Sequence, residues 1–258
     1  MLKILITGHN GYIASSLESY FKNTYDLTLV GRNDVDLIDS TSVNAWFKDK
    51  RFDVVIHTAI RGGHRLHEDD DSIFQANLKM YYNLLDNREK YTRLINIGSG
   101  AELYSLNTPY GYSKYVIRKS VLEQDNFYNI RAYGVFDENE IETRFIKSNI
   151  LKYINKENMV LHQDKQMDFF YMKDFVSLIE YYIHRATPPK EVDCSYSEVN
   201  YLSQILDIIN TLGDHAVSIT YNHSGPQPHY KGKFTNLNIK YIGLDQGIRN
   251  VYHSLCNR

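Results

Sequence analysis

The sequence predicts an α/β protein with a doubly wound parallel sheet and a small α/β lobe built from its carboxyl-terminal part. Short β-branched runs alternate with amphipathic stretches along the first half of the chain. The runs are apolar throughout, which is typical of parallel strands covered by helices on both faces. A turn with two glycines follows the first run and opens the first amphipathic stretch. Together these observations indicate a sheet of the Rossmann type.

The strands expected in the sheet cover residues 3–8, 26–31, 53–60, 93–99 and 128–134, and the helices between them cover residues 12–23, 42–50, 73–87 and 112–124. Beyond residue 134 the regular alternation weakens. There we expect a helix over 145–154, strand-like segments at 168–172, 191–197 and 216–222, a helix capped by Asp174, a helix over 202–212 and a last helix ending near Cys256. These later pieces are expected to form a lobe at the carboxyl edge of the sheet, where open α/β sheets bind ligands.

Composition excludes several classes of protein. With 258 residues, of which 43% are hydrophobic and 23% charged, the chain can bury a large core. The formal charge of −2 gives no electrostatic reason to expect nucleic acid or an anionic membrane as partner. Two distant cysteines, Cys194 and Cys256, offer neither a disulfide framework nor a metal site, so we expect a reducing cytoplasm and no metal. The first apolar run is too short for a signal peptide or a membrane span.

The turn "TGHNGYIA" has a spacing suited to a dinucleotide. Gly8 and Gly11 stand three positions apart, and the small residue Ala14 follows three positions later. Glycines permit a tight turn and let the backbone approach a pyrophosphate, which binds at the amino end of the following helix. A plain strand-to-helix turn is the alternative for these residues alone. The position of the turn after the first strand favours the dinucleotide.

The end of the second expected strand indicates which dinucleotide is bound. NAD-binding sheets of this class carry an acidic residue there to hold the ribose 2′-hydroxyl, whereas this chain has Arg32. A guanidinium suits a 2′-phosphate, so Arg32 favours NADP over the alternative of a solvated loop arginine. Asp36 and Leu37 are placed to reach the adenine, although Asp36 could equally be a solvated carboxylate. Asp39 is expected to cap the next helix.

Two Tyr-x-x-x-Lys pairs occur within "PYGYSKYVIRK", namely Tyr110 with Lys114 and Tyr115 with Lys119. The members of each pair lie one helical turn apart, and the two pairs face directions about 140° apart, at about 100° per residue. Pro109 suits the first turn of a helix, which places Tyr110 at the helix end nearest the strand ends. Tyr115 and Lys119 are expected to pack on another helix or to meet solvent.

The first pair is suited to the reduction of a carbonyl group. A phenol titrates near about pH 10 and is a weak acid–base group at neutral pH, but a nearby ammonium favours the phenolate. Lys114 would supply that ammonium and hold the nicotinamide ribose, and Ser99 would hold the substrate oxygen. For Tyr110 alone, an ordinary core or surface tyrosine is the alternative. The presence of the glycine turn and Ser99 in this order favours the site.

The chain resembles the extended short-chain dehydrogenase/reductase family, in its branch of NAD(P)-dependent nucleotide-sugar epimerases, dehydratases and reductases. The matching motifs extend over roughly two thirds of the chain and are, in family order, "TGHNGYIA", "DLID", "DVVIHTAI", "NLKMYYNLL", "GSGAELY", "YGYSK", "IRAYGVF" and "DFFYMKD". Within the branch, "LVGRNDVDLIDSTSVNAWF" and "HTAIRGGHR" are most similar to GDP-fucose synthase-like and dTDP-4-dehydrorhamnose reductase-like members. Those members are NADPH-dependent reductases of 4-keto-6-deoxy sugars.

The resemblance implies a role for each matching residue. Tyr110 would exchange a proton with the substrate, Lys114 would assist it, and Ser99 would bind the substrate oxygen. Asn77 would support the proton relay or the local structure, with a plain buried polar residue as the alternative. The residues implied to bind the cofactor are Gly8, His9, Asn10, Gly11, Tyr12, Ile13, Arg32, Asp36, Leu37, Thr58, Ala59, Ile60, Asn77, Tyr110 and Lys114. Those implied to bind the substrate are Gly62, Gly63, Ser99, Gly100, Tyr133 and Gly134, with an ordinary turn as the alternative for the first two.

The resemblance also implies domains and an assembly. Residues 1–136 with about 165–197 are expected to form the NAD(P)-binding Rossmann domain, and residues 137–164 with 198–258 the small substrate-binding lobe. Family members commonly dimerise through the helix that bears the Tyr-Lys pair and the helix before it. A homodimer is therefore expected, with packing of the same faces inside one chain as the alternative.

Several positions near the predicted serine depart from the family pattern. Ala101 stands where GDP-fucose synthase has an epimerisation cysteine, which argues against 3,5-epimerisation. The Asp-Glu pair of 4,6-dehydratases is missing, although Glu102 is close in sequence. A shift of the alignment by one residue would put Gly100 in the place of Ser99.

Two further departures concern the substrate diphosphate. Gly134 stands where many members carry an asparagine, and Met167 where an arginine is common.

The leading function is NADP-dependent reduction of a keto group, expected at C4, of a nucleotide-linked deoxy-sugar. One alternative is an NAD-dependent nucleotide-sugar C4 epimerase, which Arg32 disfavours. A second is a non-catalytic cofactor-binding module, which the intact pair of Tyr110 and Lys114 disfavours.

Overall fold

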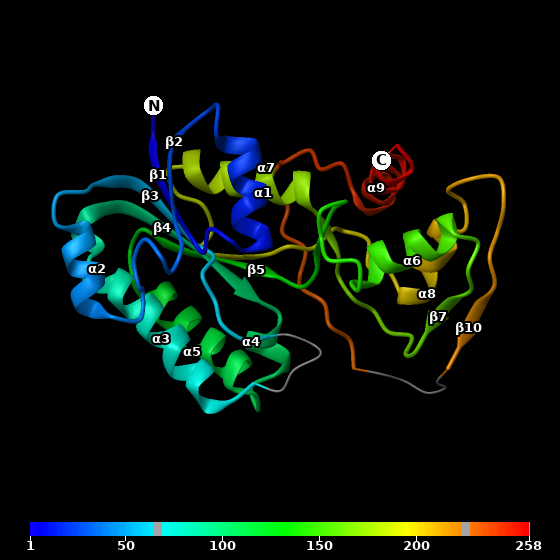
Figure 1. Cartoon of the computed structure of the whole chain (residues 1–258), viewed down its shortest axis with the longest axis horizontal. Coiled ribbons are helices and arrows are strands. Elements are labelled where there is room, and N and C mark those ends of the chain that lie inside the picture. The colour runs from blue at the N-terminus through cyan, green and yellow to red at the C-terminus, as the bar shows by residue number, and fades with distance from the viewer. Residues whose placement is uncertain (64–68, 223–227, 258) are drawn as a thin grey trace. The chain divides into compact units, whose positions relative to one another are not determined.

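The computed structural model describes residues 1–63, 69–222 and 228–257. The chain divides into two compact units (Figure 1). Unit 1 contains Met1–Arg131 and Ile179–Val192, and unit 2 contains Ala132–Leu178 and Asp193–Arg258. Within the described residues, no helix is long and apolar enough to cross a membrane.

A six-stranded sheet forms the centre of unit 1. Its strands follow the order β2-β1-β3-β4-β5-β9. Their bounds are β1 Lys3–Thr7, β2 Asp26–Val30, β3 Phe52–His57, β4 Tyr91–Ser99, β5 Phe127–Ala132 and β9 Glu191–Asp193. Strand β1 pairs in parallel with β2 and β3, and β3 pairs in parallel with β4, so that Thr7 lies opposite Val30 and His57. The predicted doubly wound parallel sheet is confirmed.

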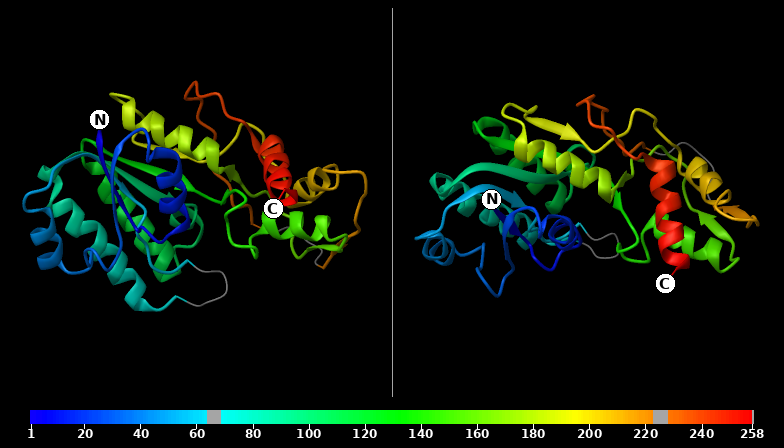
Figure 2. Two further views of the ribbon diagram at one scale, coloured as in Figure 1. Left: turned by 45° about the horizontal axis from the view of Figure 1, so that its top comes forward. Right: turned by 90° about the horizontal axis from the view of Figure 1, so that it is seen from above.

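Helices cover both faces of this sheet. Those of unit 1 are α1 Tyr12–Phe21, α2 Ser40–Phe47, α3 Asp71–Asp86, the short 3₁₀ helix η1 Arg88–Lys90, α4 Ala101–Tyr104 and α5 Pro109–Glu123. Helix α7 (Met172–His184) begins in unit 2 and ends in unit 1. Figures 1 and 2 show α1 and the end of α7 on one face, and α2, α3 and α5 on the other.

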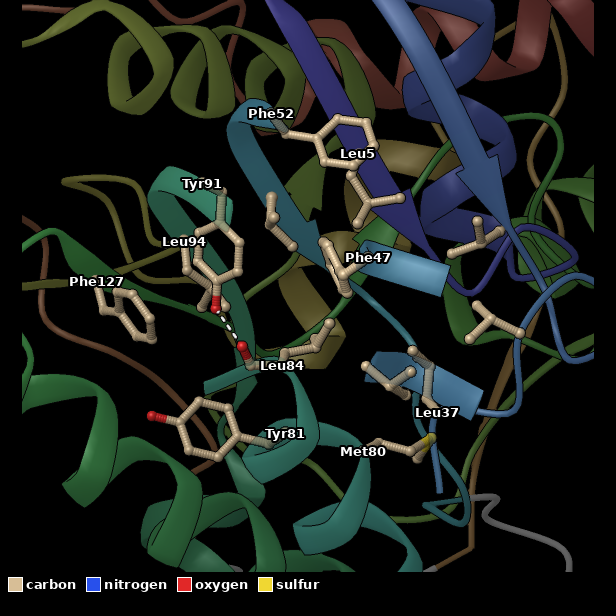
Figure 3. Packing of buried hydrophobic residues seen from close by; sticks show 14 of the residues in the cluster. Leu5, Leu37, Phe47, Phe52, Met80, Tyr81, Leu84, Tyr91, Leu94 and Phe127 are labelled. Atoms are coloured by element: carbon tan, nitrogen blue, oxygen red, sulfur yellow. Dashed lines mark hydrogen bonds between the residues drawn. The ribbon is translucent and has the colours of Figure 1, made fainter. Parts of the chain in front are cut away.

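One core of unit 1 lies between the sheet and the layer formed by α2, α3 and α5. Leu5 and Leu94 of the strands pack with Phe47 of α2 and Leu84 of α3, and all four are at most 1% exposed (Figure 3). Each such side chain contributes about 1.5–3 kcal/mol when it leaves water. The Tyr91 hydroxyl donates to the Leu84 carbonyl at 2.7 Å, which satisfies a polar group inside this layer.

The helix starts follow local sequence signals. The Asp39 carboxylate accepts a hydrogen bond from the Thr41 amide and caps α2, as predicted. The Thr108 hydroxyl accepts from the Gly111 amide and caps α5, and Pro109 takes the first helical position. The predicted placement of Pro109 in the first turn of α5 is confirmed.

Unit 2 has two small parallel sheets and a helical layer. The paired strands are β6 Val135–Phe136 with β8 Phe170–Tyr171, and β7 Met159–Leu161 with β10 Ile219–Tyr221. Its helices are the first half of α7, together with α6 Phe145–Ile154, α8 Leu202–Ile209 and α9 Leu244–Cys256. Ile150 of α6, Ile205 of α8 and Ile248 of α9 are fully buried in one core.

Two sequence predictions in unit 2 were wrong. Helix α7 begins at Met172, so Asp174 lies inside the first turn and is not a cap. Its carboxylate instead accepts from the amides of Ile242 at 2.7 Å and Gly243 at 3.0 Å, and thereby fastens the start of α9. Helix α8 ends at Ile209 and not at residue 212, because the Asn210 side chain bonds both backbone groups of Val217.

Candidate active site

The predicted glycine turn lies at the carboxyl end of β1. Gly8 has φ +85°, in the left-handed region that favours glycine. A side-chain carbon added at Gly8 would lie 2.9 Å from the backbone Cα of Ala59, so the position also lacks space. The amides of Gly8 and His9 donate to the Val30 carbonyl at 2.8 and 3.1 Å. Two neighbouring strand ends therefore hold the turn in place.

The amino end of α1 suits an anion. Gly11 is the N-cap residue, with φ −83° and ψ 150°, and no side chain of the described residues caps this helix start. The first-turn amides of a helix carry a partial positive charge, which binds phosphate groups. Ala14 is fully buried, as expected where the helix packs closely on the sheet. These features fit the pyrophosphate of a dinucleotide.

The turn after β2 lies beside the glycine turn. Val30, whose carbonyl binds the Gly8 and His9 amides, stands two residues before Arg32, and Arg32 is exposed. Asp36 accepts a hydrogen bond from the Ile38 amide at 3.0 Å, and the Leu37 side chain lies in the core, 8% exposed. The role of Arg32 at the adenosine ribose stays a prediction. Adenine contacts of Asp36 and Leu37 stay a prediction.

A buried polar group supports the end of β3. The Thr58 hydroxyl donates to the Thr7 carbonyl at 2.6 Å, and the Thr7 hydroxyl lies 2.9 Å from His57 Nδ1. Burial, with a smaller effect from the positive charge of Lys114, lowers the pKa of His57 to about 3. His57 is therefore neutral at physiological pH. Sequence reasoning missed this residue, because one histidine at the end of an apolar strand carries no distinctive signal.

Asn77 joins the segment after β3 to helix α5. Its side-chain oxygen accepts from the Arg61 amide at 2.8 Å, and its side-chain nitrogen donates to the Arg61 carbonyl and the Ser113 hydroxyl, both at 3.0 Å. The Ser113 hydroxyl donates in turn to the Tyr110 carbonyl at 2.7 Å. These contacts give Asn77 a role in local structure. Its cofactor contact stays a prediction.

Tyr110 and Lys114 occupy the first two turns of α5, next to the end of β4. Lys114 is 5% exposed, and its ammonium donates to the Ile97 carbonyl at 2.6 Å. Burial lowers the pKa of Lys114 to about 8, while the negative charge of Glu102 acts in the opposite direction. A lysine with this pKa is mostly protonated at pH 7 but can lose its proton within the working range of an enzyme.

The predicted Gly62–Gly63 turn packs on the ring of Tyr110. Both glycines have positive φ, 78° and 73°. A side-chain carbon at Gly63 would lie 2.8 Å from the Tyr110 ring carbon that bears the hydroxyl. The Asp69 carboxylate accepts from the Gly63 amide at 3.0 Å. The last two residues of the motif "HTAIRGGHR", 64 and 65, lie outside the described residues.

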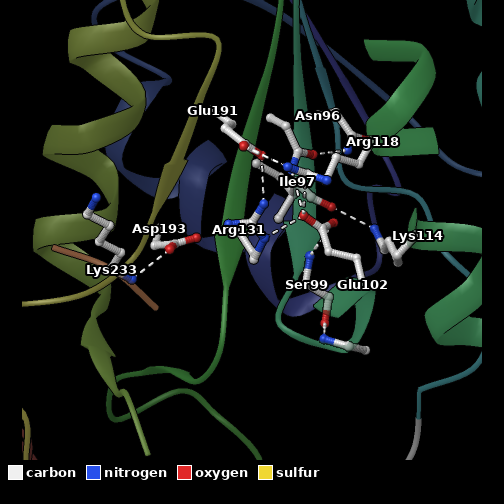
Figure 4. A network of polar contacts seen from close by, with 12 residues as sticks. Asn96, Ile97, Ser99, Glu102, Lys114, Arg118, Arg131, Glu191, Asp193 and Lys233 are labelled. Atoms are coloured by element: carbon white, nitrogen blue, oxygen red, sulfur yellow. Dashed lines mark hydrogen bonds and ion pairs between the residues drawn. The ribbon is translucent and has the colours of Figure 1, made fainter. Parts of the chain in front are cut away.

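Ser99 is the last residue of β4, and Gly100 is the N-cap residue of the short helix α4. The Ser99 hydroxyl accepts a hydrogen bond from the Ala101 amide at 3.2 Å (Figure 4). The Ser99 amide donates to the Glu102 carboxylate at 3.3 Å. Ser99 thus stands at the strand end that also receives the Lys114 ammonium. Contacts of Ser99 and Gly100 with a substrate stay predictions.

The second Tyr-x-x-x-Lys pair lies elsewhere on α5. The Tyr115 ring stacks on the Tyr112 ring with centroids 6.2 Å apart, and the Lys119 ammonium lies 5.7 Å from the Tyr115 ring centroid. Phe74 of α3 stacks on Tyr112 in the same row. This aromatic row is separate from the contacts of Lys114, as the helical spacing predicts.

The predicted substrate residues Tyr133 and Gly134 belong to unit 2. The Tyr133 ring meets Tyr230 edge to face, with centroids 5.3 Å apart. A side-chain carbon at Gly134 would lie 2.9 Å from the Phe169 ring, so an asparagine does not fit without movement of that ring. Met167 is 4% exposed in the core of unit 2. The two departures near the expected diphosphate are thus both packed positions.

A shallow depression elsewhere in unit 1 does not coincide with these residues. It is lined by Met1, Glu18, Lys22, Tyr25, Asp26, Leu27 and Leu29. Because β1 and β2 begin beside these residues, the depression lies at the opposite edge of the parallel sheet from Gly8. Ligands of open α/β sheets bind at the carboxyl edge, which favours the site around Gly8 and Lys114. No group of three or more potential metal-ligating side chains occurs in the described parts of the chain.

The fold has many counterparts among solved structures. GDP-mannoheptose C4 reductase from Campylobacter jejuni, with NADP bound, is 14% identical at a TM-score of 0.80, covering 99% of this chain and 98% of that one. GDP-L-fucose synthetase from Naegleria fowleri, bound to NADP, is 17% identical at 0.75, covering 99% and 93%. UDP-glucose 4-epimerase from Thermotoga maritima, with UDP-glucose, is 14% identical at 0.81, covering 99% of each chain. At these identities the likeness establishes the fold.

The family is established by the sequence itself. No curated protein matches the chain closely enough to count as a relative. A family model described as "NAD dependent epimerase/dehydratase family" matches residues 4–194, which include the glycine turn, Ser99, Tyr110 and Lys114. The match confirms the resemblance to extended short-chain dehydrogenases and agrees with the predicted nicotinamide dinucleotide cofactor. The chain belongs to the NAD dependent epimerase/dehydratase family of enzymes.

Proposed function

We propose that this protein is an NADP-dependent reductase of a keto group, at C4, of a nucleotide-linked deoxy-sugar. The observation that carries the proposal is the start of α5. There Tyr110 lies in the first turn, and Lys114, one turn later, is buried against the Ile97 carbonyl at the end of β4. This arrangement puts a phenol and an ammonium at the carboxyl edge of the sheet, where the glycine turn also lies.

The proposed chemistry assigns one task to each residue. NADPH supplies the hydride to the carbonyl carbon when it is bound. Tyr110 gives its hydroxyl proton to the carbonyl oxygen, which becomes the alcohol. Lys114 stabilises the resulting phenolate through its positive charge and binds the nicotinamide ribose. Ser99 donates its hydroxyl proton in a hydrogen bond to the same substrate oxygen and fixes its position.

The choice of NADP rests on Arg32. Arg32 lies two residues after Val30, the last residue of β2, whose carbonyl binds the glycine turn. The Arg32 guanidinium suits the 2′-phosphate of NADP. Two of the similar structures, the mannoheptose reductase and the fucose synthetase, have NADP bound. Titration of the purified protein with NADPH and with NADH tests the choice, and tighter binding of NADH would refute it.

The substrate proposal extends to unit 2. We propose that residues 137–164 with 198–258 form the lobe that binds the nucleotide-sugar, with Tyr133, Gly134, Gly62 and Gly63 near the substrate. The structures similar to this chain include enzymes named for GDP- and UDP-linked sugars. A screen of nucleotide-linked 4-keto sugars for oxidation of NADPH would identify the substrate class.

The test of catalysis is a comparison of two tyrosines on one helix. Tyr110→Phe removes the proposed proton donor and should abolish reduction of a keto-sugar while NADPH binding is retained. Tyr115→Phe removes a hydroxyl from the aromatic row on α5 and should leave turnover largely intact. Equal effects of the two substitutions would refute the assignment of Tyr110. Full turnover by Tyr110→Phe would do so as well.

A second candidate function is that of an NAD-dependent C4 epimerase. It would use the same tyrosine and lysine, and the similar structures include a UDP-glucose 4-epimerase. An epimerase of this kind keeps its cofactor bound, so purified protein carrying tight NAD without added cofactor would favour this reading. A protein that binds NADPH but reduces no keto-sugar would favour a non-catalytic module.

The assembly and its location are also proposals. We propose a homodimer in the cytoplasm, joined through α3 and α5. Tyr82 of α3 and Tyr112 of α5 are 37% and 47% exposed, so both helices present aromatic surface that a second copy could cover. Sedimentation of the purified protein gives its mass in solution, and a monomer would refute the dimer.

A further inference from the structure

A buried carboxylate lies beneath the proposed catalytic residues. Glu102, the second residue of α4, is fully buried. Figure 4 shows its carboxylate between the end of β4, strand β5 and helix α5. One oxygen accepts from Arg131 Nε at 2.5 Å and from the Asn129 side-chain amide at 2.9 Å. The other accepts from the Ser99 amide at 3.3 Å. Both oxygens of the Glu102 carboxylate therefore accept hydrogen bonds from other groups of the protein.

The chain makes room for this carboxylate at β4. A side-chain carbon added at Gly98 would lie 2.9 Å from the Glu102 carboxylate and 2.7 Å from the Asn129 amide. Glycine weakens a strand interior, and it is often found where another group approaches closely. Gly98 therefore leaves space for the Glu102 carboxylate, which explains why β4 has no side chain at this position.

The Glu102 carboxylate belongs to a network of charges with an excess of cations. Glu191 receives two hydrogen bonds from Arg118, at 2.6 and 2.7 Å, and one from Arg131 at 2.6 Å. Arg118 Nε also lies 3.8 Å from the Glu102 carboxylate. With Lys114 on the other side of Glu102, two carboxylates face three cations.

Lys114 and Glu102 bond to backbone groups two positions apart on β4: the Lys114 ammonium donates to the Ile97 carbonyl, and the Glu102 carboxylate accepts from the Ser99 amide (Figure 4). The neighbours of Lys114 that carry charge or titrate are the neutral His57 at the end of β3, Tyr110 one turn earlier on α5, and Glu102 of α4. Burial favours the neutral amine of Lys114, and the Glu102 carboxylate acts against that effect. Burial raises the pKa of Glu102 as well, and the guanidinium of Arg131 opposes the rise.

We propose that Glu102 is the buried counterion that keeps Lys114 protonated, and that it acts as a positioning residue for Ser99 without contacting the substrate. The meaning of the proposal for catalysis rests on the proposed function, but the charge relation between the two side chains does not. A dehydratase-type acid or base needs an open carboxyl group, whereas both oxygens of Glu102 are engaged by Arg131, Asn129 and Ser99.

The experiment measures the titration of Lys114 directly, in the full chain and without substrate. The side-chain resonances of lysine are followed by NMR against pH, and Lys114→Met identifies the signal of interest. In the wild-type protein Lys114 should titrate near pH 8. In Glu102→Gln it should titrate at a clearly lower pH, and affinity for NADPH near neutral pH should fall. In Glu102→Asp, which keeps the negative charge, Lys114 should titrate close to its wild-type pH.

Glu191→Gln is the matched control, because it removes one negative charge from the same network. Glu191 acts on Arg118 and Arg131, whereas Glu102 is the carboxylate that acts on Lys114. In Glu191→Gln, Lys114 should titrate at the same pH as in the wild-type protein. An unchanged Lys114 titration in Glu102→Gln, or an equal shift in Glu191→Gln, would overturn the proposal. If Glu102→Gln does not fold, the Lys114 titrations of Glu102→Asp and Glu191→Gln are compared with each other, and a larger downward shift in Glu191→Gln than in Glu102→Asp contradicts the proposal. Failure to reduce any keto-sugar would count against the proposed function alone.

Discussion

The buried histidine at the end of β3 makes the stability of this protein depend on pH in a predictable way. His57 has a pKa of about 3 in the folded chain, against 6.5 for an ordinary histidine. The unfolded chain takes up a proton below pH 6.5, while the folded chain keeps His57 neutral. Protons therefore favour the unfolded state, and the free energy of unfolding falls as pH falls from 6.5 towards 3. Between pH 7 and pH 5 this one group should remove about 2 kcal/mol.

The assay compares unfolding by urea at pH 7 and pH 5 in the wild-type protein and in His57→Asn. The asparagine can keep a hydrogen bond to the Thr7 hydroxyl, and it leaves no group that titrates in this range. The variant should be less stable at both pH values because of lost packing, but its stability should change by about 2 kcal/mol less between them. His9→Asn, at a histidine of the glycine turn whose side chain is 45% exposed, is the matched control. An identical pH dependence in His57→Asn and the wild type would refute the reasoning.

Three further predictions concern the cofactor site and the assembly. Gly8→Ala should lower the free energy of unfolding by at least about 1–2 kcal/mol, from its positive φ alone, and should abolish NADPH binding, because the added carbon meets the Ala59 backbone. Gly243→Ala, at a positive φ with open space around the added carbon, is the control and should keep NADPH binding. Arg32→Ala should weaken binding of NADPH by roughly 10-fold or more and leave binding of NADH unchanged, as measured by fluorescence titration; an equal loss for both would contradict the 2′-phosphate contact. Tyr112→Glu should convert the proposed dimer to a monomer in sedimentation, and an unchanged mass would exclude this surface.

Features of this protein that could be predicted from the sequence are those whose cause is local. The cap of α2 by Asp39 and the start of α5 at Pro109 follow from residues within three positions of each other. The position of the Tyr110–Lys114 pair on α5 then follows from helical spacing. The glycine turn was predictable for the same reason, since Gly8 and Gly11 act on the backbone at their own positions.

The remainder of the site depends on partners that are distant in sequence. From the sequence alone, Glu102 is only a residue close to the position of the missing dehydratase pair, because its partner Arg131 is 29 residues away on β5. Asp174 looked like a helix cap, because its binding partners, the amides of Ile242 and Gly243, are 68 and 69 residues away. An acidic residue near a helix start is compatible with either role. Only the tertiary structure distinguishes them.

The two departures from the family at the expected diphosphate follow from packing in unit 2. The position of Gly134 is closed by the Phe169 ring, 2.9 Å from where a side-chain carbon would lie. An arginine at Met167 would place a charge among buried apolar side chains, which is costly unless a partner is buried with it. Single substitutions back to the family residues would thus destabilise unit 2 before they could add a contact. The nucleotide end of the substrate is expected to be recognised elsewhere, and a substrate panel that varies the nucleotide and the sugar independently tests this directly.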